Sequence, residues 1–426
     1  MKIVKVTGWL LAAQLVLVPL SFAIESDVDR LLELLVEKKV LTREDANAFR
    51  AEVAMQKQEE KPAPVMPSWL ENTKLKGDVR VRYEWDKNKG LQDNSRARIR
   101  ARLGVESKIS NKFKLGIGMA TGRTNDPRSR DITLGNSSSP NTPGSGKDII
   151  LDYAYGQYTP VKWFTLTAGK FQNNLWQNLD IFWDNDLTPE GFGFNLSHKL
   201  NANLDLFFND LFFALKNDSR TDKQAFLEAA QPGFRWGITK NTGLKGAVAY
   251  YHFKSVKSAR RFSDSRGGAV PYAGSGNTIL GGRYKYNYDS FQPTFELSFK
   301  EPLQGLVPYL AIFGDYIRNV SHIPTGAGGF DVGLKFGAEK VSDFKQWQAK
   351  IVYAKLGRDC WLDILTDNNR YGGATNSESI EGILEFGLGK YVSLVMDYYA
   401  TWSLTKAVGT DYAPEQLLQV DWNLRF

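Results

Sequence analysis

The stretch LKGDVRVRYEW at residues 75–85, followed by RARIRARLGVESKI at residues 96–109, decides the fold. Both stretches alternate between apolar and charged residues. Because successive side chains of a β-strand point to opposite faces, this period of two predicts strands with one apolar face and one charged face. The charged face needs water or opposite charges around it, while the other face needs an apolar environment.

The same alternation continues to the C-terminus and predicts about sixteen strands. Their expected ranges are 74–85, 95–109, 112–123, 147–158, 162–171, 190–199, 202–215, 225–239, 243–255, 290–300, 306–317, 329–341, 345–357, 378–389, 391–403 and 415–426. Short turns, such as Ser110-Asn111, alternate with long polar loops, such as 124–146, 256–289 and 358–377. This arrangement is typical of outer-membrane barrels. We therefore expect an all-β fold, a transmembrane antiparallel β-barrel over residues 69–426.

The apolar face of these strands is expected to contact outer-membrane lipid. After Ala23 no apolar run reaches the roughly 20 residues that a transmembrane helix needs. A closed barrel is the other spanning structure in which every backbone group is paired. The side chains expected to face lipid include Val79, Val81, Ile99, Leu103, Leu115 and Leu424.

Residues 1–23 have the pattern of a secretory signal peptide. Lys2 and Lys5 precede an apolar run, and Ser21-Phe22-Ala23 ends it with small residues around one aromatic. We expect cleavage after Ala23. A membrane anchor is the alternative, but the apolar run is short for a span.

Residues 24–58 change to helical spacing and predict a helical hairpin or a short coiled-coil segment. The chain breaks near Lys39, and Thr42 has the position of a helix N-cap. The segment is too small to be stable alone, so its apolar stripe needs a partner. We expect it to lie in the periplasm and to contact the cell wall or other copies of the chain. Residues 59–68 read as a Pro-rich linker.

The chain ends on an alternating strand whose apolar members are Trp422, Leu424 and Phe426. This ending resembles the terminal strand of outer-membrane proteins, whose final aromatic residue is read by the barrel-assembly machinery. The resemblance implies that these three residues form an assembly signal. The alternative is an ordinary amphipathic strand that ends at a phenylalanine.

Two longer stretches carry a family resemblance. Residues 164–196, FTLTAGKFQNNLWQNLDIFWDNDLTPEGFGFNL, and residues 31–53, LLELLVEKKVLTREDANAFRAEV, resemble a bacterial putative porin family. In that family a helix pair precedes the barrel, and a glycine often stands where this chain has Lys39. The resemblance implies an outer-membrane channel and does not name a solute.

The charged face of the first three strands is strongly basic. Alternate residues on one strand lie about 7 Å apart, so neighbouring cations repel by about 2.4 kcal/mol at an effective dielectric constant of about 20. A wetted lumen with acids across it tolerates such a row. A nucleic-acid surface is disfavoured, because Tyr83 and Trp85 lie on the opposite face and cannot stack bases beside the arginines. The expected pore-lining basic residues are Arg80, Arg82, Arg98, Arg100, Arg102, Lys112 and Lys114.

Residues 172–189 form the third long loop in this strand order. By resemblance to general porins, this loop folds inward and narrows the pore. Trp176, Phe182 and Trp183 are expected to pack it against the wall. Its acids, expected to face the passage, are Asp180, Asp184, Asp186 and Glu190. The alternative is a solvated acidic turn.

These features predict a water-filled porin for passive diffusion of small hydrophilic solutes or ions, with a preference for anions. General porins are commonly trimers, so a homotrimer is expected by analogy. The alternatives are a non-conducting structural or adhesin barrel and a barrel hydrolase. His198, His252 and His322 are far apart in sequence, and Cys360 is the sole cysteine. We therefore expect no enzyme, no cofactor, no metal site and no nucleic-acid partner.

Overall fold

A computed structural model describes residues 31–59, 71–88, 93–135, 144–217, 223–262, 276–303, 307–405 and 414–426. The chain divides into two compact units, Met1–Pro67 and Ser68–Phe426. The predicted signal peptide at 1–23 lies outside the described residues, and so does the predicted linker beyond Glu59.

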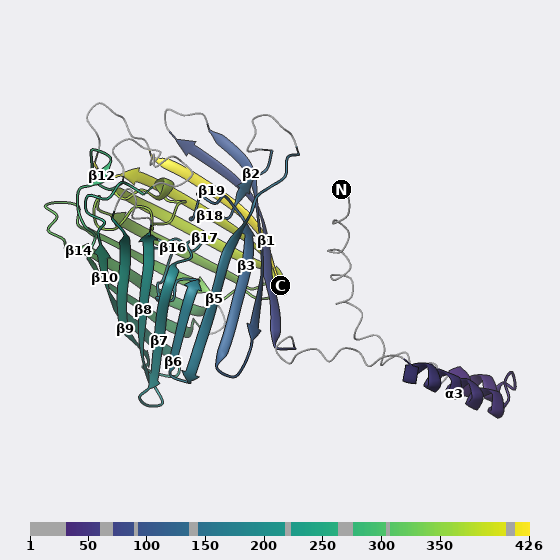
Figure 1. Ribbon diagram of the computed structural model, residues 1–426. Helices are drawn as coiled ribbons and strands as arrows, with labels where there is room; N and C mark the ends of the chain where they lie inside the picture. Colours follow the sequence, from purple (N-terminus) through teal and green to yellow (C-terminus); the bar gives the residue numbers. More distant parts are fainter. Residues whose placement is uncertain are drawn as a thin grey trace, which may run out of the picture. The chain divides into compact units, whose positions relative to one another are not determined.

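Sixteen long strands form a closed antiparallel barrel in the larger unit (Figure 1). They are β1 (Thr73–Asn88), β2 (Asn94–Lys108), β3 (Phe113–Thr121), β5 (Ile149–Val161), β6 (Phe164–Lys170), β7 (Glu190–Lys199), β8 (Leu204–Lys216), β9 (Ala225–Gly237), β10 (Thr242–Lys254), β13 (Ser290–Leu303), β14 (Val307–Asn319), β15 (Gly328–Gly337), β16 (Trp347–Leu356), β17 (Ser377–Gly389), β18 (Val392–Ser403) and β19 (Glu415–Arg425). Each strand pairs with its neighbour in this order, and β1 also pairs with β19, which closes the sheet. The predicted barrel is confirmed. The largest error in a strand end is at β15, which stops at Gly337 and not at residue 341.

Three shorter strands lie in the connections between the long ones. The two-residue β4 (Ile132–Thr133) pairs with β2 after the chain has left the wall at the end of β3. β11 (Ile279–Leu280) and β12 (Arg283–Tyr284) form a separate two-stranded ribbon. These pieces belong to long loops on the rim opposite the short turns.

The two faces of the wall differ as the alternation predicts. Val81 and Leu103 are 39% and 46% exposed on the outer face, whereas the neighbouring Arg82 and Arg98 are 5% and 9% exposed. Val79, Ile99, Leu115 and Leu424 share this outer face and are partly or fully exposed. The apolar face therefore points outward, where lipid would lie, and the charged face points into the barrel.

Four loop segments fold into the barrel, and we call them the interior segments: residues 122–131, 171–189, 276–289 and 357–377. The second, third and fourth of these pack with inward side chains of β8, β9, β10, β14 and β16 in one apolar cluster. Members include Phe182 and Trp183 from the second segment, Trp361 and Leu365 from the fourth, and Phe253 from β10. The lumen is therefore partly filled by the protein's own loops.

Within the smaller unit, the described residues 31–59 form two helices joined by a tight turn, as predicted. Residues 31–37 are helical, and α3 spans Arg43–Glu59. Lys39 adopts a left-handed φ of 57°, so this turn has the backbone conformation that a glycine would favour. Thr42 caps α3: its hydroxyl accepts the Asp45 amide at 3.1 Å, and the Asp45 carboxylate accepts the Thr42 amide at 3.2 Å. Among the described residues, no helix combines the length and apolar character needed to cross a membrane.

We predict that an arginine at the outward position 81 destabilises the barrel far more than one at position 75. Val81 lies in the middle of β1, whereas Leu75 lies near the short-turn end. A lipid-facing arginine costs about 2–4 kcal/mol at the bilayer midplane and about 0–1 near an interface. Equilibrium unfolding of Val81→Arg and Leu75→Arg in lipid vesicles measures the difference. Equal losses for the two variants would mean that the β1 face does not contact lipid.

Candidate channel lining

The register of β1 and β2 places arginine directly opposite arginine on the inner face. Arg80 is the cross-strand partner of Arg100, and Arg82 is the partner of Arg98. Like charges in such positions repel, so each guanidinium needs a carboxylate beside it. Six residues form this group, which we call the arginine wall: Arg80, Arg82, Arg96, Arg98, Arg100 and Arg102.

Two acids of β1 supply charge compensation from within the same pair of strands. The Glu84 carboxylate accepts hydrogen bonds from Nε of Arg96 at 2.6 Å and from Nη1 of Arg98 at 3.0 Å. Asp78 accepts Nη2 of Arg100 at 2.8 Å. Glu84 is only 1% exposed, so its charge is held by these guanidinium groups and not by water.

Two further acids come from elsewhere in the chain. Asp421 of β19 accepts Nε and Nη2 of Arg82 at 2.6 and 2.8 Å, a bidentate pair across the barrel seam. Asp131 of the first interior segment lies 3.4 Å from Arg80 and 3.7 Å from Arg82. Burial raises the pKa of Asp131, but the neighbouring arginines lower it more, and the result is a pKa below its usual range.

The second interior segment contributes one acid to the wall. Asp186 lies 3.7 Å from both Arg100 and Arg102. Six guanidinium groups therefore face the five carboxylates of Asp78, Glu84, Asp131, Asp186 and Asp421. The arginine wall is a nearly neutral ion-pair network. Its acids come from two strands and two loops, and Arg100 is 6% exposed.

The two lysines predicted beside the arginines occupy different places. Lys114 lies on the inner face of β3, where its amine is 3.2 Å from Glu106 and stands over the Tyr155 ring. Lys112 lies in the exposed turn that precedes β3. It is therefore at the rim of the barrel and not on the lumen wall.

The second interior segment, residues 171–189, crosses the inside of the barrel. Asn178 donates to Asp315 of β14 at 3.2 Å, which fixes the segment against the far wall. Phe182 and Trp183 are buried, as predicted. Trp176 is partly buried, packs on Phe207 and receives the amine of Lys245 over its ring at 3.8 Å.

Of the four acids predicted to face the passage, Asp186 alone reaches the arginine wall. Asp184 is 5% exposed and accepts the Asn368 amide of the fourth interior segment at 3.0 Å. Burial, and then the neighbouring Asp186 carboxylate, raise the pKa of Asp184 well above its usual range. Asp180 accepts the side-chain amide of Asn185 at 2.9 Å, and burial also raises its pKa.

Glu190 requires a correction. It is the first residue of β7, and the strand alternation turns it outward together with the exposed Phe192. Its carboxylate pairs with Lys170 at 2.9 Å and is 64% exposed. Glu190 is therefore outside the lumen, because the loop ends one residue before it.

The fourth interior segment, residues 357–377, was expected to be an external polar loop and is instead almost entirely buried. Trp361 donates its indole N–H to the Phe182 carbonyl, and the Asp184 amide donates to the Leu365 carbonyl at 2.8 Å. The two interior segments are thus bonded to each other. A signal was available in the sequence, since CWLDIL at residues 360–365 is too apolar for a solvated loop.

Arg370 of that segment meets a second set of charges on the far wall. It pairs with Glu381 of β17 and lies 3.3 Å from Asp367. Asp315 and Asp331 are cross-strand partners on β14 and β15, both buried. The sequence alone singles out none of these residues, because a contact between a loop guanidinium and a strand carboxylate depends on the path of the loop.

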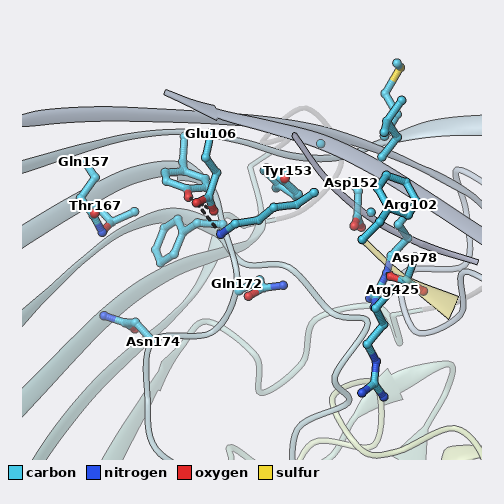
Figure 2. A pocket seen from close by; sticks show the side chains of 18 of the residues that line it. Asp78, Arg102, Glu106, Asp152, Tyr153, Gln157, Thr167, Gln172, Asn174 and Arg425 are labelled. Carbon is cyan, nitrogen blue, oxygen red and sulfur yellow. Dashed lines mark hydrogen bonds and ion pairs between the residues drawn. The ribbon is translucent and has the colours of Figure 1, made fainter. Parts of the chain in front are cut away.

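A cavity of about 500 Å³ remains between the arginine wall and the start of the second interior segment (Figure 2). Arg102 and Asp78 line it on one side, and Gln157, Thr167 and Asn174 on another, with Gln172 from the interior segment between them. A larger space of about 1170 Å³ opens beside Lys335 and Glu296. Polar side chains therefore line the space that the loops leave inside the barrel.

The last residues of the chain lie at the seam. The backbones of Phe426 and Gly77 exchange two hydrogen bonds, of 3.1 and 3.0 Å, and a side chain at position 77 would collide with the Phe426 ring. Trp422 and Leu424 alternate outward on β19, and Trp422 is 47% exposed. The predicted assembly signal thus consists of outward residues on the closing strand.

The sequence matches the model of a family described as "Putative porin" over residues 87–271 and 303–426. The chain belongs to this family. Membership and the closed barrel together support a porin-type channel in the outer membrane and indicate a non-enzymatic protein. Within the described residues, no group of three or more His, Cys, Asp or Glu side chains is arranged to hold a metal ion.

Solved porins resemble this family member in structure. A triple mutant of the Rhodopseudomonas blastica porin is 10% identical, with a TM-score of 0.43, over 83% of this chain and 100% of that one. The high-pH structure of Pseudomonas putida OprB is 10% identical, with a TM-score of 0.49, over 84% and 96%. A search of curated proteins returned no match.

We predict that Glu84→Gln destabilises the porin strongly, whereas Glu190→Gln does not. The first change keeps the side-chain size but leaves buried guanidinium groups without their carboxylate, which costs about 3–5 kcal/mol. The second removes an exposed pair worth about 0–1 kcal/mol. Urea unfolding followed by intrinsic fluorescence compares them. Similar stability of both variants would contradict an ion-pair network that holds the wall together.

Proposed function

We propose that this protein is an outer-membrane porin through which small hydrophilic solutes and ions diffuse passively, with a modest preference for anions. The observation that carries the proposal is a closed sixteen-strand barrel whose inner face is polar around open space. A non-conducting structural or adhesin barrel is the alternative. Ion current across a planar bilayer separates the two, because only the channel produces conductance steps.

The preference for anions is supported by the greater exposure of the basic side chains to water. At the network's edge the side chains of Arg96 and Arg102 are 33% and 31% exposed, whereas those of Asp78 and Asp186 are both 14% exposed. Lumen charges concentrate counter-ions within about one Debye length, roughly 8 Å at physiological salt. Exposed cations with buried acids therefore attract anions, although the network as a whole is nearly neutral.

We predict that a salt gradient across a bilayer gives a reversal potential of the sign expected for anion preference. Arg102→Gln should shift this potential toward cations, and the shift should fade in molar salt because screening shortens the Debye length. Lys112→Gln removes the same charge from the rim turn and serves as the matched control. A cation-preferring channel, or equal shifts in both variants, would contradict the role of the wall.

We further propose that residues 1–23 are a signal peptide cleaved after Ala23 and that residues 24–58 form a periplasmic helical segment joined to the barrel by the linker at 59–68. The capped hairpin supports this, because two short helices with exposed Leu31 and Leu34 have little core of their own. A cell-wall component or the same segment of other copies would cover that surface. We propose that the protein forms a homotrimer and that the helical segment assists the association of its subunits. We also propose that the C-terminal strand directs insertion of the barrel by the assembly machinery.

We predict that deleting residues 24–60 leaves the barrel folded but weakens its oligomers or its attachment to the cell wall. The reason is that the larger unit contains the whole closed sheet, whereas the exposed apolar stripe belongs to the smaller one. Unheated gels report barrel folding and oligomers, and fractionation with purified cell wall reports attachment. If oligomers and attachment both persist unchanged, the segment has neither function.

A further inference from the structure

The cavity beside the arginine wall has a lining whose charges cancel. Its carboxylates are Asp78, Glu106 and Asp152, and its cations are Lys76, Arg102 and Arg425. Several of these charges already neutralise one another, since Asp78 pairs with Arg102 at 2.5 Å and Glu106 with Lys76 at 2.6 Å. The cavity therefore offers paired charges that donate and accept hydrogen bonds, and its lining has as many cations as carboxylates.

Two tyrosine rings form one side of this cavity, and the strand sequence makes room for them. Three glycines on β2 and β3 stand where the rings of Tyr153 and Tyr155 lie: Gly104, Gly116 and Gly118. A Cβ at any of these positions would come within 1.8 to 2.9 Å of a tyrosine ring or hydroxyl. The ring centroids are 5.8 Å apart. The wall is thus recessed at three successive positions, which seats both rings against the backbone.

Amide and hydroxyl groups continue the lining beyond the rings. Gln157 donates to Thr167 at 3.2 Å, and Asn195 donates to the Asn174 carbonyl at 3.3 Å. The side chain of Asn174 donates to the Asp210 carbonyl at 2.8 Å, but its Oδ1 is buried and accepts no hydrogen bond from the chain. This oxygen is closed to the cavity, so the amide and hydroxyl groups of Gln157, Thr167 and Asn195 are the ones that offer hydrogen bonds to a ligand with O–H groups.

We propose that this cavity is a binding site for a neutral polyhydroxylated solute, a sugar of one or two rings, on its way through the channel. The hydroxyl groups of a sugar can form hydrogen bonds with the paired charges and amides of the lining. The apolar face of a sugar ring can pack against a tyrosine ring. The volume of about 500 Å³ lies within the range of small-molecule sites, about 300 to 1,000 Å³.

The proposal rests on the porin function, because the site is useful only in a passage. Gln172 and Asn174 belong to the start of the second interior segment, so the cavity lies where that segment leaves the wall. A site in a passage must bind weakly enough to release its solute. Such a site speeds the flux of its solute at low concentration relative to a solute of equal size that it does not hold.

The other solute classes fit the lining less well. An anion would meet the carboxylates of Asp78, Glu106 and Asp152, and a cation would meet three basic groups. An apolar solute would remove water from all of these groups without replacing its hydrogen bonds. A zwitterion also has balanced charge, so glycine betaine, which has no hydroxyl group to donate, is the informative comparison.

The test uses the full-length porin in planar bilayers and measures how glucose, maltose and glycine betaine reduce the ion current from one side. We expect the sugars to block at millimolar concentration and betaine to have no effect. Tyr153→Ala should raise the blocking concentration of the sugars by about tenfold, the effect of one lost ring contact. Asn174→Leu, which removes an amide from the lining and keeps the volume, should also raise it.

Tyr309→Ala is the matched control. Tyr309 also lies on the inner face, bonds to a glutamate at 3.4 Å and has a lysine over its ring, but it lies on the far wall beside the larger space. Its blocking concentrations should equal those of the wild type. Each variant must first show wild-type conductance in salt alone. If Tyr153→Ala does not, Tyr153→Phe replaces it, and because this variant keeps the ring, its block by sugars should stay close to that of the wild type.

The outcomes separate this inference from the porin function. Salt conductance with no block by either sugar, or equal block by betaine, overturns the sugar site and leaves the porin intact. The absence of any conductance overturns the porin function itself. A block that Tyr309→Ala weakens as much as Tyr153→Ala overturns the location of the site.

Discussion

The pairing of Arg82 with Asp421 is the contact on which the rest of the structure depends. Arg82 lies on the first barrel strand and Asp421 on the last, and their bidentate bond spans the seam that closes the sheet. A buried guanidinium is tolerable only beside a carboxylate. The same requirement draws Asp131 and Asp186 from two different loops to the same wall. Charge compensation thus organises both the wall and the loops that fill the lumen.

The interior divides into two chemically different halves. Around β1, β2 and β19 the loops are held by ion pairs, whereas around β8 to β10 they are held by an apolar cluster that contains Phe253 and Trp361. The second interior segment belongs to both halves, since Asp186 reaches the arginines and Trp183 packs against Phe213. This double attachment gives the segment one defined course across the barrel, and the space left beside it determines what can pass.

The alternation of apolar and charged side chains predicts most of the fold from this sequence. It located all sixteen strands, because Val81 and Arg82 point to opposite faces whatever the tertiary context. It failed at residues 357–377, because a loop has no strand alternation and the prediction left out the apolar run CWLDIL at 360–365. The basic wall and its need for acids nearby were predictable from Arg98, Arg100 and Arg102, but the identity of most of these acids was not. Asp421 and Asp131 are distant in sequence, and only strand register and loop path bring them close.

The seam also determines at which point of folding the barrel can close. Gly77 and Phe426 stand at opposite ends of the barrel sequence yet share two backbone hydrogen bonds. Because β19 is the strand that pairs with this edge of β1, a chain without β19 holds Arg80 and Arg82 on an open edge without Asp421. Such an edge is polar, cationic and unable to enter lipid. Closure of the barrel therefore requires the last strand, because this strand brings the carboxylate that neutralises arginine charge on the first strand.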